Sequence, residues 1–278
     1  MSVFLVFVIA AGYGVSWYYQ SPYILYIAVV FALLVNVWSY WYSDKVVLSM
    51  SKAHPATREK YFDFYTVTEN LAITAGLPMP KLYVIDDPAP NAFATGRNEK
   101  HAVVCATTGL LSMMNRKELE GVVAHELSHI KNRDILFMTI VVILAGFLAV
   151  IADLSWRFSL FGGGGEREGN NQLTLILVVV GIVVAPLAAK LIQLAISRRR
   201  EFLADASGAL LTRYPEGLAF ALQKIEAFGM PMRKPSHATA HMFIGDPFGV
   251  KKTNWRTRLF STHPSVKDRV AALLGTTQ

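Results

Sequence analysis

Four long runs of residues without a charged side chain divide this 278-residue chain. A helix needs about 20 mainly apolar residues to cross the hydrocarbon core of a bilayer, and each run approaches or reaches that length. A polar break at 20–22 separates the first two runs, and a glycine-rich loop at 157–171 separates the last two. The runs cover residues 3–19, 23–42, 135–152 and 169–189. The pattern therefore predicts two transmembrane hairpins, at 1–42 and 135–196, and two polar segments, at 43–134 and 197–278.

In the two polar segments, apolar residues recur at the spacings of amphipathic helices and short strands, as in a folded domain. Residues 57–75 and 117–124 have the apolar spacing of amphipathic helices, and the chain after Pro264 is predicted to be a last helix. Short apolar stretches bounded by turn residues predict strands at 81–86, 92–95 and 102–107. We expect an α+β protein, mostly helical, in which the two polar segments form one zincin-like catalytic domain with a small antiparallel sheet.

Composition agrees with an integral membrane protein. Hydrophobic residues make up 53% of the chain and charged residues 17%, and the first charged side chain is Asp44. Between the third and fourth runs the only basic residues are Arg157 and Arg167, whereas both polar segments are rich in lysine and arginine. Because basic residues stay on the cytoplasmic side, we expect the termini and the catalytic domain to face the cytoplasm. The protein itself is expected in the cytoplasmic (inner) membrane.

Charge and cysteine content narrow the class of protein further. The net charge of +7 is explained by basic residues close to anionic headgroups, and no nucleic-acid-binding motif is present, so nucleic acid is not expected as a partner. The single Cys105 excludes an internal disulfide and fits a reducing compartment. Its apolar neighbours indicate a buried residue of a strand.

The chemistry is concentrated in the sequence His125-Glu126-Leu127-Ser128-His129. Residues four apart project from the same face of a helix, so the two imidazoles can bind one metal ion while Glu126 stands beside it. A catalytic zinc takes three protein ligands and keeps one position open. The motif predicts a zinc hydrolase with His125 and His129 as ligands and Glu126 as general base.

Several motifs, taken together, resemble those of the HtpX-type membrane zinc endopeptidases, which are distantly related to the CAAX prenyl proteases. They occur in the order and spacing of that family, with two apolar runs on each side of the zinc motif. They are Asn91-Ala92-Phe93-Ala94-Thr95-Gly96, the zinc motif followed by Asn132, Arg198-Arg199-Arg200-Glu201-Phe202-Leu203-Ala204-Asp205, and Ser261-Thr262-His263-Pro264.

The resemblance implies the rest of the site and its biological role. Glu201 resembles the third ligand of a site with one Zn²⁺ per subunit, and Asp205 resembles the acceptor that orients His125. Asn132 belongs to the same surroundings of the metal. The implied activity is endopeptidase cleavage of polypeptides, in quality control of damaged or misassembled membrane proteins under stress.

Two further roles follow from what peptide hydrolysis needs. His263 is a candidate donor to the developing oxyanion, although it could instead cap the last helix. The strand that begins after Asn91, covering Ala92, Phe93, Ala94 and Thr95, is a candidate edge strand for binding an extended peptide through main-chain hydrogen bonds.

Three alternatives remain open. A zinc transporter or a catalytically inactive zinc-binding scaffold would also hold metal, but the four apolar runs contain no histidine or glutamate, and a scaffold has no need of Glu126. A protease that cuts within the membrane would place the zinc motif inside an apolar run, whereas charged residues precede this one. His237 and His241 could form a second metal site, although no acidic residue lies between them.

Overall fold

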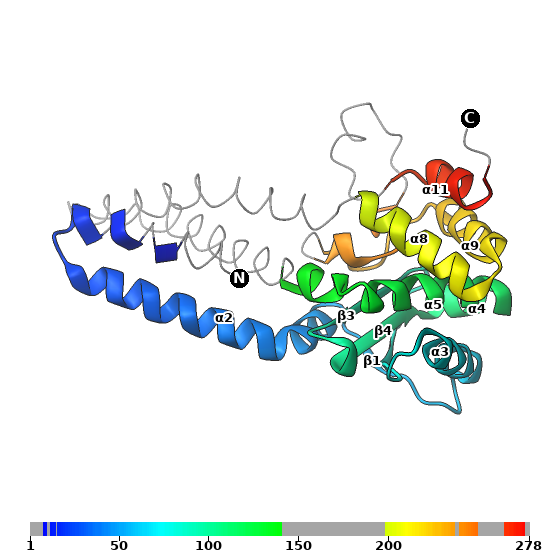
Figure 1. Cartoon of the computed structure of the whole chain (residues 1–278), viewed down its shortest axis with the longest axis horizontal. Helices are drawn as coiled ribbons and strands as arrows, with labels where there is room; N and C mark the ends of the chain where they lie inside the picture. The colour runs from blue at the N-terminus through cyan, green and yellow to red at the C-terminus, as the bar shows by residue number, and fades with distance from the viewer. Residues whose placement is uncertain are drawn as a thin grey trace. The chain divides into compact units, whose positions relative to one another are not determined.

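The computed structural model describes residues 8–9, 12–14, 16–140, 198–236, 239–249 and 264–275. The chain divides into two compact units, one made of residues 1–43 and 140–192 and the other of residues 44–139 and 193–278. The second unit contains the sheet, the helix with the zinc motif and the helices that pack around it. The labelled elements, coloured along the chain in Figure 1, are α2 Pro22–Met50, β1 His54–Pro55, α3 Phe62–Ala75, β2 Lys81–Ile85, β3 Ala92–Gly96, η1 Glu99–His101, β4 Ala102–Thr107, α4 Thr108–Met113, α5 Arg116–Lys131, α8 Arg198–Thr212, α9 Pro215–Phe228, η2 Ala240–Met242 and α11 Val266–Leu273.

The expected membrane spans are largely untested by this structure. The run at 23–42 lies within α2, a helix of 29 residues. The run at 169–189, most of the run at 135–152 and about half of the run at 3–19 lie outside the described residues. Among the residues that are described, no helix is both long and apolar enough to cross a membrane. The four-span arrangement therefore stays a prediction.

The sheet is mixed, and the expected antiparallel sheet is wrong. Its strand order is β1-β2-β4-β3. The pairs β1–β2 and β3–β4 are antiparallel, but β2 and β4 run parallel, with Lys81 opposite Val103 and Ile85 opposite Thr107. The chain leaves β2, forms β3 at the edge, and returns through η1 to place β4 between them. This crossover makes the two inner strands parallel, which strand lengths and turn residues alone do not reveal.

Local sequence explains where the helices around the sheet begin and end. Helix α5 starts with a capping box, in which the Asn115 side chain accepts from the Glu118 N–H and the Glu118 carboxylate accepts from the Asn115 N–H. Helix α3 ends at Gly76, whose φ of 70° is the left-handed conformation that closes many helices. Fixed ends at both helices give α5 a defined register against the sheet.

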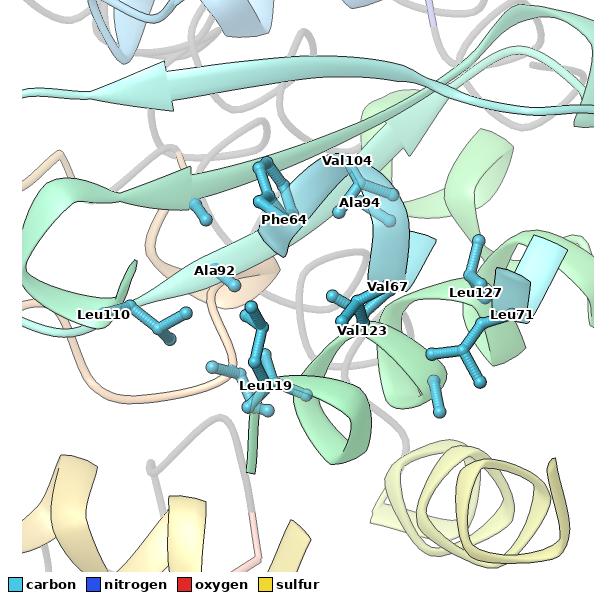
Figure 2. Packing of buried hydrophobic residues seen from close by; sticks show 14 of the residues in the cluster. Phe64, Val67, Leu71, Ala92, Ala94, Val104, Leu110, Leu119, Val123 and Leu127 are labelled. Carbon is cyan, nitrogen blue, oxygen red and sulfur yellow. The ribbon is translucent and has the colours of Figure 1, made fainter. Parts of the chain in front are cut away.

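The core of this unit lies between the sheet and the helices α3 and α5. Phe64, Val67 and Leu71 of α3 pack with Val123 and Leu127 of α5, and all five are buried. Figure 2 shows these side chains converging beneath strands β3 and β4. The burial removes one face of α5 from water, which leaves its opposite face, with the zinc motif, directed toward the helices that follow.

Helices α8 and α9 cover that opposite face of α5, as Figure 1 shows. Their approach depends on small residues. A Cβ atom added to Gly208 of α8 would lie 3.0 Å from the His125 backbone nitrogen, and one added to Gly121 of α5 would lie 2.5 Å from the Leu218 nitrogen. Any larger side chain at these positions would separate the helices. Backbone contact between α8 and α5 is what brings the second half of the site to the zinc motif.

Candidate metal centre

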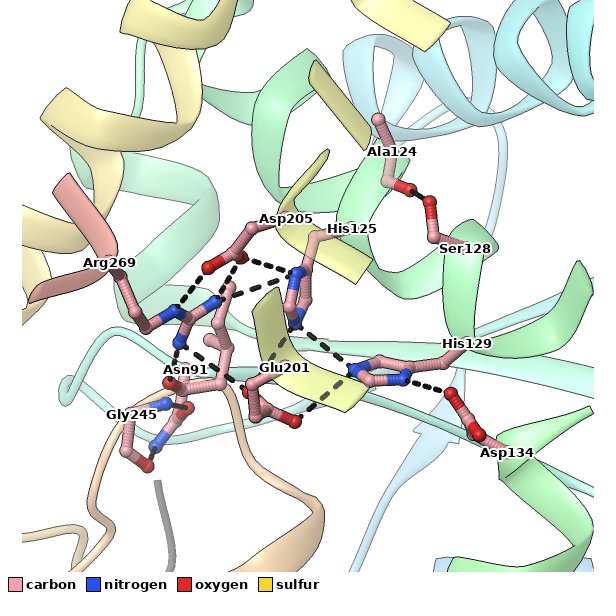
Figure 3. A network of polar contacts seen from close by, with 11 residues as sticks. Asn91, Ala124, His125, Ser128, His129, Asp134, Glu201, Asp205, Gly245 and Arg269 are labelled. Carbon is pink, nitrogen blue, oxygen red and sulfur yellow. Dashed lines mark hydrogen bonds and ion pairs between the residues drawn. The ribbon is translucent and has the colours of Figure 1, made fainter. Parts of the chain in front are cut away.

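The structure brings together the three predicted zinc ligands. His125 and His129 come from α5 and Glu201 from the first turn of α8, and each is at most 4% exposed. The His125 Nε2 and His129 Nε2 atoms are 3.2 Å apart. A Glu201 oxygen lies 3.5 Å from His129 Nε2 and the other lies 3.9 Å from His125 Nε2. Figure 3 shows these atoms turned toward one point.

These distances fit a zinc ion. Zinc binds imidazole nitrogen and carboxylate oxygen at about 2.0–2.2 Å in tetrahedral geometry, so neighbouring ligand atoms should lie about 3.3 Å apart. The distances of 3.2, 3.5 and 3.9 Å among the two Nε2 atoms and the two Glu201 oxygens bracket this value, and each residue offers one ligand atom within 4.8 Å of the other two. A set of two imidazoles and one carboxylate also leaves room for a fourth ligand, as a catalytic site requires.

Each histidine has a carboxylate on its other ring nitrogen. His125 Nδ1 lies 2.9 Å from Asp205 Oδ1, and His129 Nδ1 lies 3.1 Å from Asp134 Oδ2. Such partners fix the ring orientation and the tautomer, leaving Nε2 for the metal. Asp205 was expected from the resemblance of its motif to that of the membrane zinc endopeptidases. Asp134 was missed, although its place just beyond the helix that carries His129 could have suggested it.

Asn132, expected in the surroundings of the metal, keeps that role only as a prediction. It is the residue that ends α5, where its backbone N–H donates to the Ser128 carbonyl. Its Nδ2 atom is buried without a hydrogen-bond partner in the described part of the chain, and Asp134 occupies the place beside His129. Arg200 of α8 lies with Nε 3.8 Å from Asp134 Oδ1 and with its guanidinium over the Phe137 ring.

Sequence reasoning missed the most buried cation of the site. Arg269 of α11 is 1% exposed, and its Nη2 and Nε atoms lie 2.6 and 2.8 Å from the two oxygens of Asp205. Its Nη1 lies 3.6 Å from Glu201 Oε2. Burial alone would lower the pKa of Arg269, but these carboxylates raise it overall, so the guanidinium stays charged. Arg269 therefore neutralises part of the negative charge around the metal ligands.

The electrostatics at Glu126 suit a group that exchanges protons. Burial, opposed by the charge of His129, raises the pKa of the Glu126 carboxyl from 4.5 to about 7. A general base works best with a pKa near the working pH. The carboxylate also accepts a hydrogen bond from the backbone of Ala94, which sets Glu126 against strand β3. The predicted base thus lies between the metal ligands and the predicted substrate strand.

Strand β3 is the edge of the described sheet, and its outer side is only partly open. Ala92 and Ala94 share an orientation because alternate residues of an antiparallel strand direct their backbone groups to the same side. The Ala92 carbonyl accepts from the Ile244 N–H at 2.9 Å. The Asn91 side chain exchanges two hydrogen bonds of 3.0 Å with the backbone of Gly245. The segment at 244–245 therefore already occupies one end of the strand edge.

The remaining candidates divide between the described residues and those outside them. His263 and His237 lie outside the described residues, so the oxyanion role of His263 stays a prediction. His241 is buried, and its Nε2 atom lies 3.3 Å from the Met138 carbonyl oxygen. Cys105 is buried in β4, as its neighbours predicted, and burial raises the pKa of its thiol well above the ordinary value.

The fold and the site define a class of protein, a metallopeptidase with two ligands and the base on one helix and the third ligand on a second. The chain belongs to peptidase family M48, which matches residues 62–277. It is a metal-dependent protease, and this prediction from the zinc motif is confirmed.

Relatives in several bacteria and archaea are similar over nearly the whole chain. A protein named Protease HtpX homolog from Caldanaerobacter subterraneus subsp. tengcongensis is 47% identical, over 98% of this chain and 91% of its own. One of the same name from Pyrococcus furiosus is 48% identical over 89% of this chain and 84% of its own. The crystal structure of Ste24p from S. mikatae has a TM-score of 0.55 at 20% identity, covering 90% of this chain and 58% of Ste24p. That likeness shows the fold alone.

Proposed function

We propose that this protein is a zinc-dependent endopeptidase of the cytoplasmic membrane, with its active site on the cytoplasmic side. The observation that carries the proposal is the spacing of His125, His129 and Glu201, which suits one tetrahedral zinc with an open position. The four uncharged runs and the distribution of lysine and arginine support membrane anchoring by four helices. One Zn²⁺ per subunit completes the site.

The residues of the site divide the work of peptide hydrolysis. Zinc, when bound, acts as a Lewis acid toward the scissile carbonyl and lowers the pKa of water. Glu126 accepts the proton of the attacking water and then donates it to the nitrogen of the leaving amine. Asp205 and Asp134 hold the two imidazoles in the ligating tautomer. His263 is the proposed donor to the oxyanion.

The backbone of the substrate pairs with strand β3 in this proposal. A peptide added at a sheet edge is held by main-chain hydrogen bonds, which accept many side chains and give broad specificity. Because Ile244 already pairs with Ala92 and the Ala94 N–H donates to Glu126, the group proposed for this pairing is the Ala94 carbonyl. Pairing at Ala94 would place the scissile bond beside the general base.

Membrane proteins are the proposed substrates, cleaved in quality control of damaged or misassembled chains. The uncharged run at 135–152 begins six residues after His129, so this metal ligand lies close in the sequence to a predicted membrane span. Segments that leave the bilayer nearby would reach the site before soluble proteins do. A zinc-binding scaffold or transporter is not favoured, because neither function requires a carboxylate such as Glu126 at the metal.

The test measures cleavage and metal content together. The full-length protein, purified in neutral detergent, should bind one zinc and cleave an unstructured protein such as casein. Glu126→Gln should keep zinc and lose activity by a factor of about 10² to 10⁴ or more. Glu201→Ala should lose zinc under limiting metal. A Glu126→Gln variant that cleaves at the parent rate with zinc bound would show that Glu126 is not the base.

A further inference from the structure

A basic hollow lies beyond the metal centre, next to the turn that follows α5. Its volume is about 460 Å³. Three cationic side chains line it, Arg97 and Lys100 from the connection between β3 and β4 and Arg133 from the turn after α5. Three apolar side chains also line it, Ile130, Ile135 and Leu136. The hollow thus combines positive charge with an apolar wall.

The backbone at Arg133 is held in a conformation that a side chain rarely adopts. Its φ is 61°, in the left-handed region, between the end of α5 and the helical residues 134–140. A residue other than glycine in this region costs free energy, and such positions recur at ligand sites. Glycine or asparagine would fit the turn better, yet the chain places an arginine there. The arginine side chain is 86% exposed at the hollow.

The charges of the hollow favour an anion. Glu99 is the acidic residue of its lining, and its Oε1 atom lies 4.0 Å from Arg133 Nε, the limit for an ion pair. In the described part of the lining, one carboxylate lies with three cationic side chains, a composition that favours an anionic ligand. The neighbouring carboxylate of Asp134 is already held by His129 and Arg200. Arginine and lysine both commonly bind phosphate groups.

We propose that this hollow binds the phosphate headgroup of an anionic phospholipid, an inference that rests on the proposed membrane anchoring. Arg133 lies two residues before Ile135, where the third uncharged run begins, so it stands at the end of a predicted membrane span. An arginine at such a position can extend its guanidinium into the headgroup layer. The apolar wall at Ile135 and Leu136 suits the start of an acyl chain, which free phosphate does not possess.

The experiment uses the full-length protein, delipidated in neutral detergent micelles, and follows its thermal unfolding midpoint. Phosphatidylglycerol should raise the midpoint by roughly 5–10 °C when its concentration is about a hundred times the Kd. Phosphatidylcholine tests whether any lipid suffices, and inorganic phosphate and glycerol 3-phosphate test whether the headgroup alone suffices. We expect none of these three to produce the rise. An equal rise with any of them would overturn the proposal.

A matched pair of variants places the effect at the hollow. Arg133→Gly removes one charge and suits the left-handed backbone, so the variant should fold at least as well as the parent. Arg213→Gly does the same at another exposed arginine, with φ of 54°, at the end of α8. The lipid response should shrink in Arg133→Gly and in Lys100→Gln but not in Arg213→Gly. A full response in Arg133→Gly, or equal loss in both glycine variants, would contradict the assignment.

Casein cleavage separates this inference from the proposed function. A protein that cleaves casein but shows no response to phosphatidylglycerol refutes the lipid site alone. A protein with the expected lipid response that binds no zinc and cleaves nothing refutes the protease proposal alone.

Discussion

Arg269 and Asp205 form a two-pronged ion pair inside the catalytic unit, with nitrogen–oxygen distances of 2.6 and 2.8 Å, although 64 residues separate them in the sequence. Asp205 also contacts His125, so the pair links α11 and α8 to the zinc helix. Burial alone would raise the pKa of Asp205, but the charge and hydrogen bonds of Arg269 lower it overall. Asp205 is therefore an ionised acceptor for His125.

Removing Arg269 should destabilise the fold strongly. Arg269→Ala leaves Asp205 as an uncompensated buried charge, and the expected loss is about 3–5 kcal/mol in the free energy of unfolding. Denaturant unfolding of the detergent-solubilised protein measures it. Arg58→Ala is the matched control, because Arg58 pairs with Glu69 at 3.0 Å on the surface, and it should cost about 1 kcal/mol or less. Similar losses in the two variants would mean that the buried ion pair stabilises the fold no more than the surface pair does.

Asp134 should control metal affinity through His129. Asp134→Ala frees the imidazole to rotate, so zinc affinity should fall by about 10 to 100 fold while the fold persists. Asp86→Ala is the control, because Asp86 lies the same 3.1 Å from a histidine, His54, but on the surface and away from the ligands. Zinc competition with a chelator measures both. Unchanged zinc affinity in Asp134→Ala would show that Asp134 does not contribute to metal binding.

Glu126→Gln should stabilise the metal-free protein in a pH-dependent way. The folded-state pKa of Glu126 is raised from 4.5 to about 7, so above pH 7 the folded protein carries a buried charge that the unfolded chain solvates. This cost disappears as the pH falls from 7 toward 4.5, where the folded carboxyl takes up a proton. At pH 8 the free energy of unfolding of Glu126→Gln should exceed that of the parent by on the order of 3 kcal/mol at most.

The pH dependence is the decisive part of that measurement. Unfolding of parent and Glu126→Gln in a chelator should converge near pH 4.5 and separate above pH 7. Glu59→Gln, at an exposed position, provides the control for loss of a surface carboxylate. A glutamine advantage that is constant with pH would show that packing, not charge, explains it.

The sequence revealed His125 and His129 through helical spacing, because two histidines four apart lie on one face of a helix. Glu201 and Asp205 were implied by the resemblance of their motif to that of the family, since a glutamate and an aspartate four apart do not by themselves indicate a metal site. Arg269 could not be found this way. It is one arginine among many in the sequence, and only the packing of α11 against α8 removes it from water.

The local elements of the fold could be predicted from the sequence, but their arrangement could not. Strands β2, β3 and β4 and the helices α3 and α5 follow from apolar spacing and turn residues, although α3 begins at Phe62 and not at residue 57, and the two-residue strand β1 was not predicted. The parallel pairing of β2 with β4 depends on which strand occupies the middle of the sheet, and that order is decided by tertiary packing. The hydrogen bond between Ile244 and Ala92 depends on the same packing across 152 residues.

His263 remains a prediction from the sequence and needs its own test. His263→Ala should lower kcat by about 10² to 10³ with little change in zinc content, because an oxyanion donor acts on the barrier and not on the metal. Ser265 is the N-cap of α11, so His263 does not hold that position. If the role of His263 is structural in another way, the variant will lose thermal stability and the folded fraction will cleave at the parent rate. Turnover normalised to folded, zinc-loaded protein separates the two roles.

The proposed topology can be tested by cysteine labelling from each side of the membrane. The natural Cys105 need not be removed, since it is buried in β4 and burial raises the pKa of its thiol, which makes it unreactive. Ile73 of α3 is 72% exposed, so Ile73→Cys should react in a folded protein. If the catalytic unit faces the cytoplasm, a membrane-impermeant maleimide should label it only after the cells are opened. Asn170→Cys, in the predicted external loop and outside the described residues, should be labelled in intact cells. In the four-span arrangement one span, at 135–152, lies between the two positions, so they must face opposite sides of the bilayer. Labelling of both positions from the same side would overturn that arrangement.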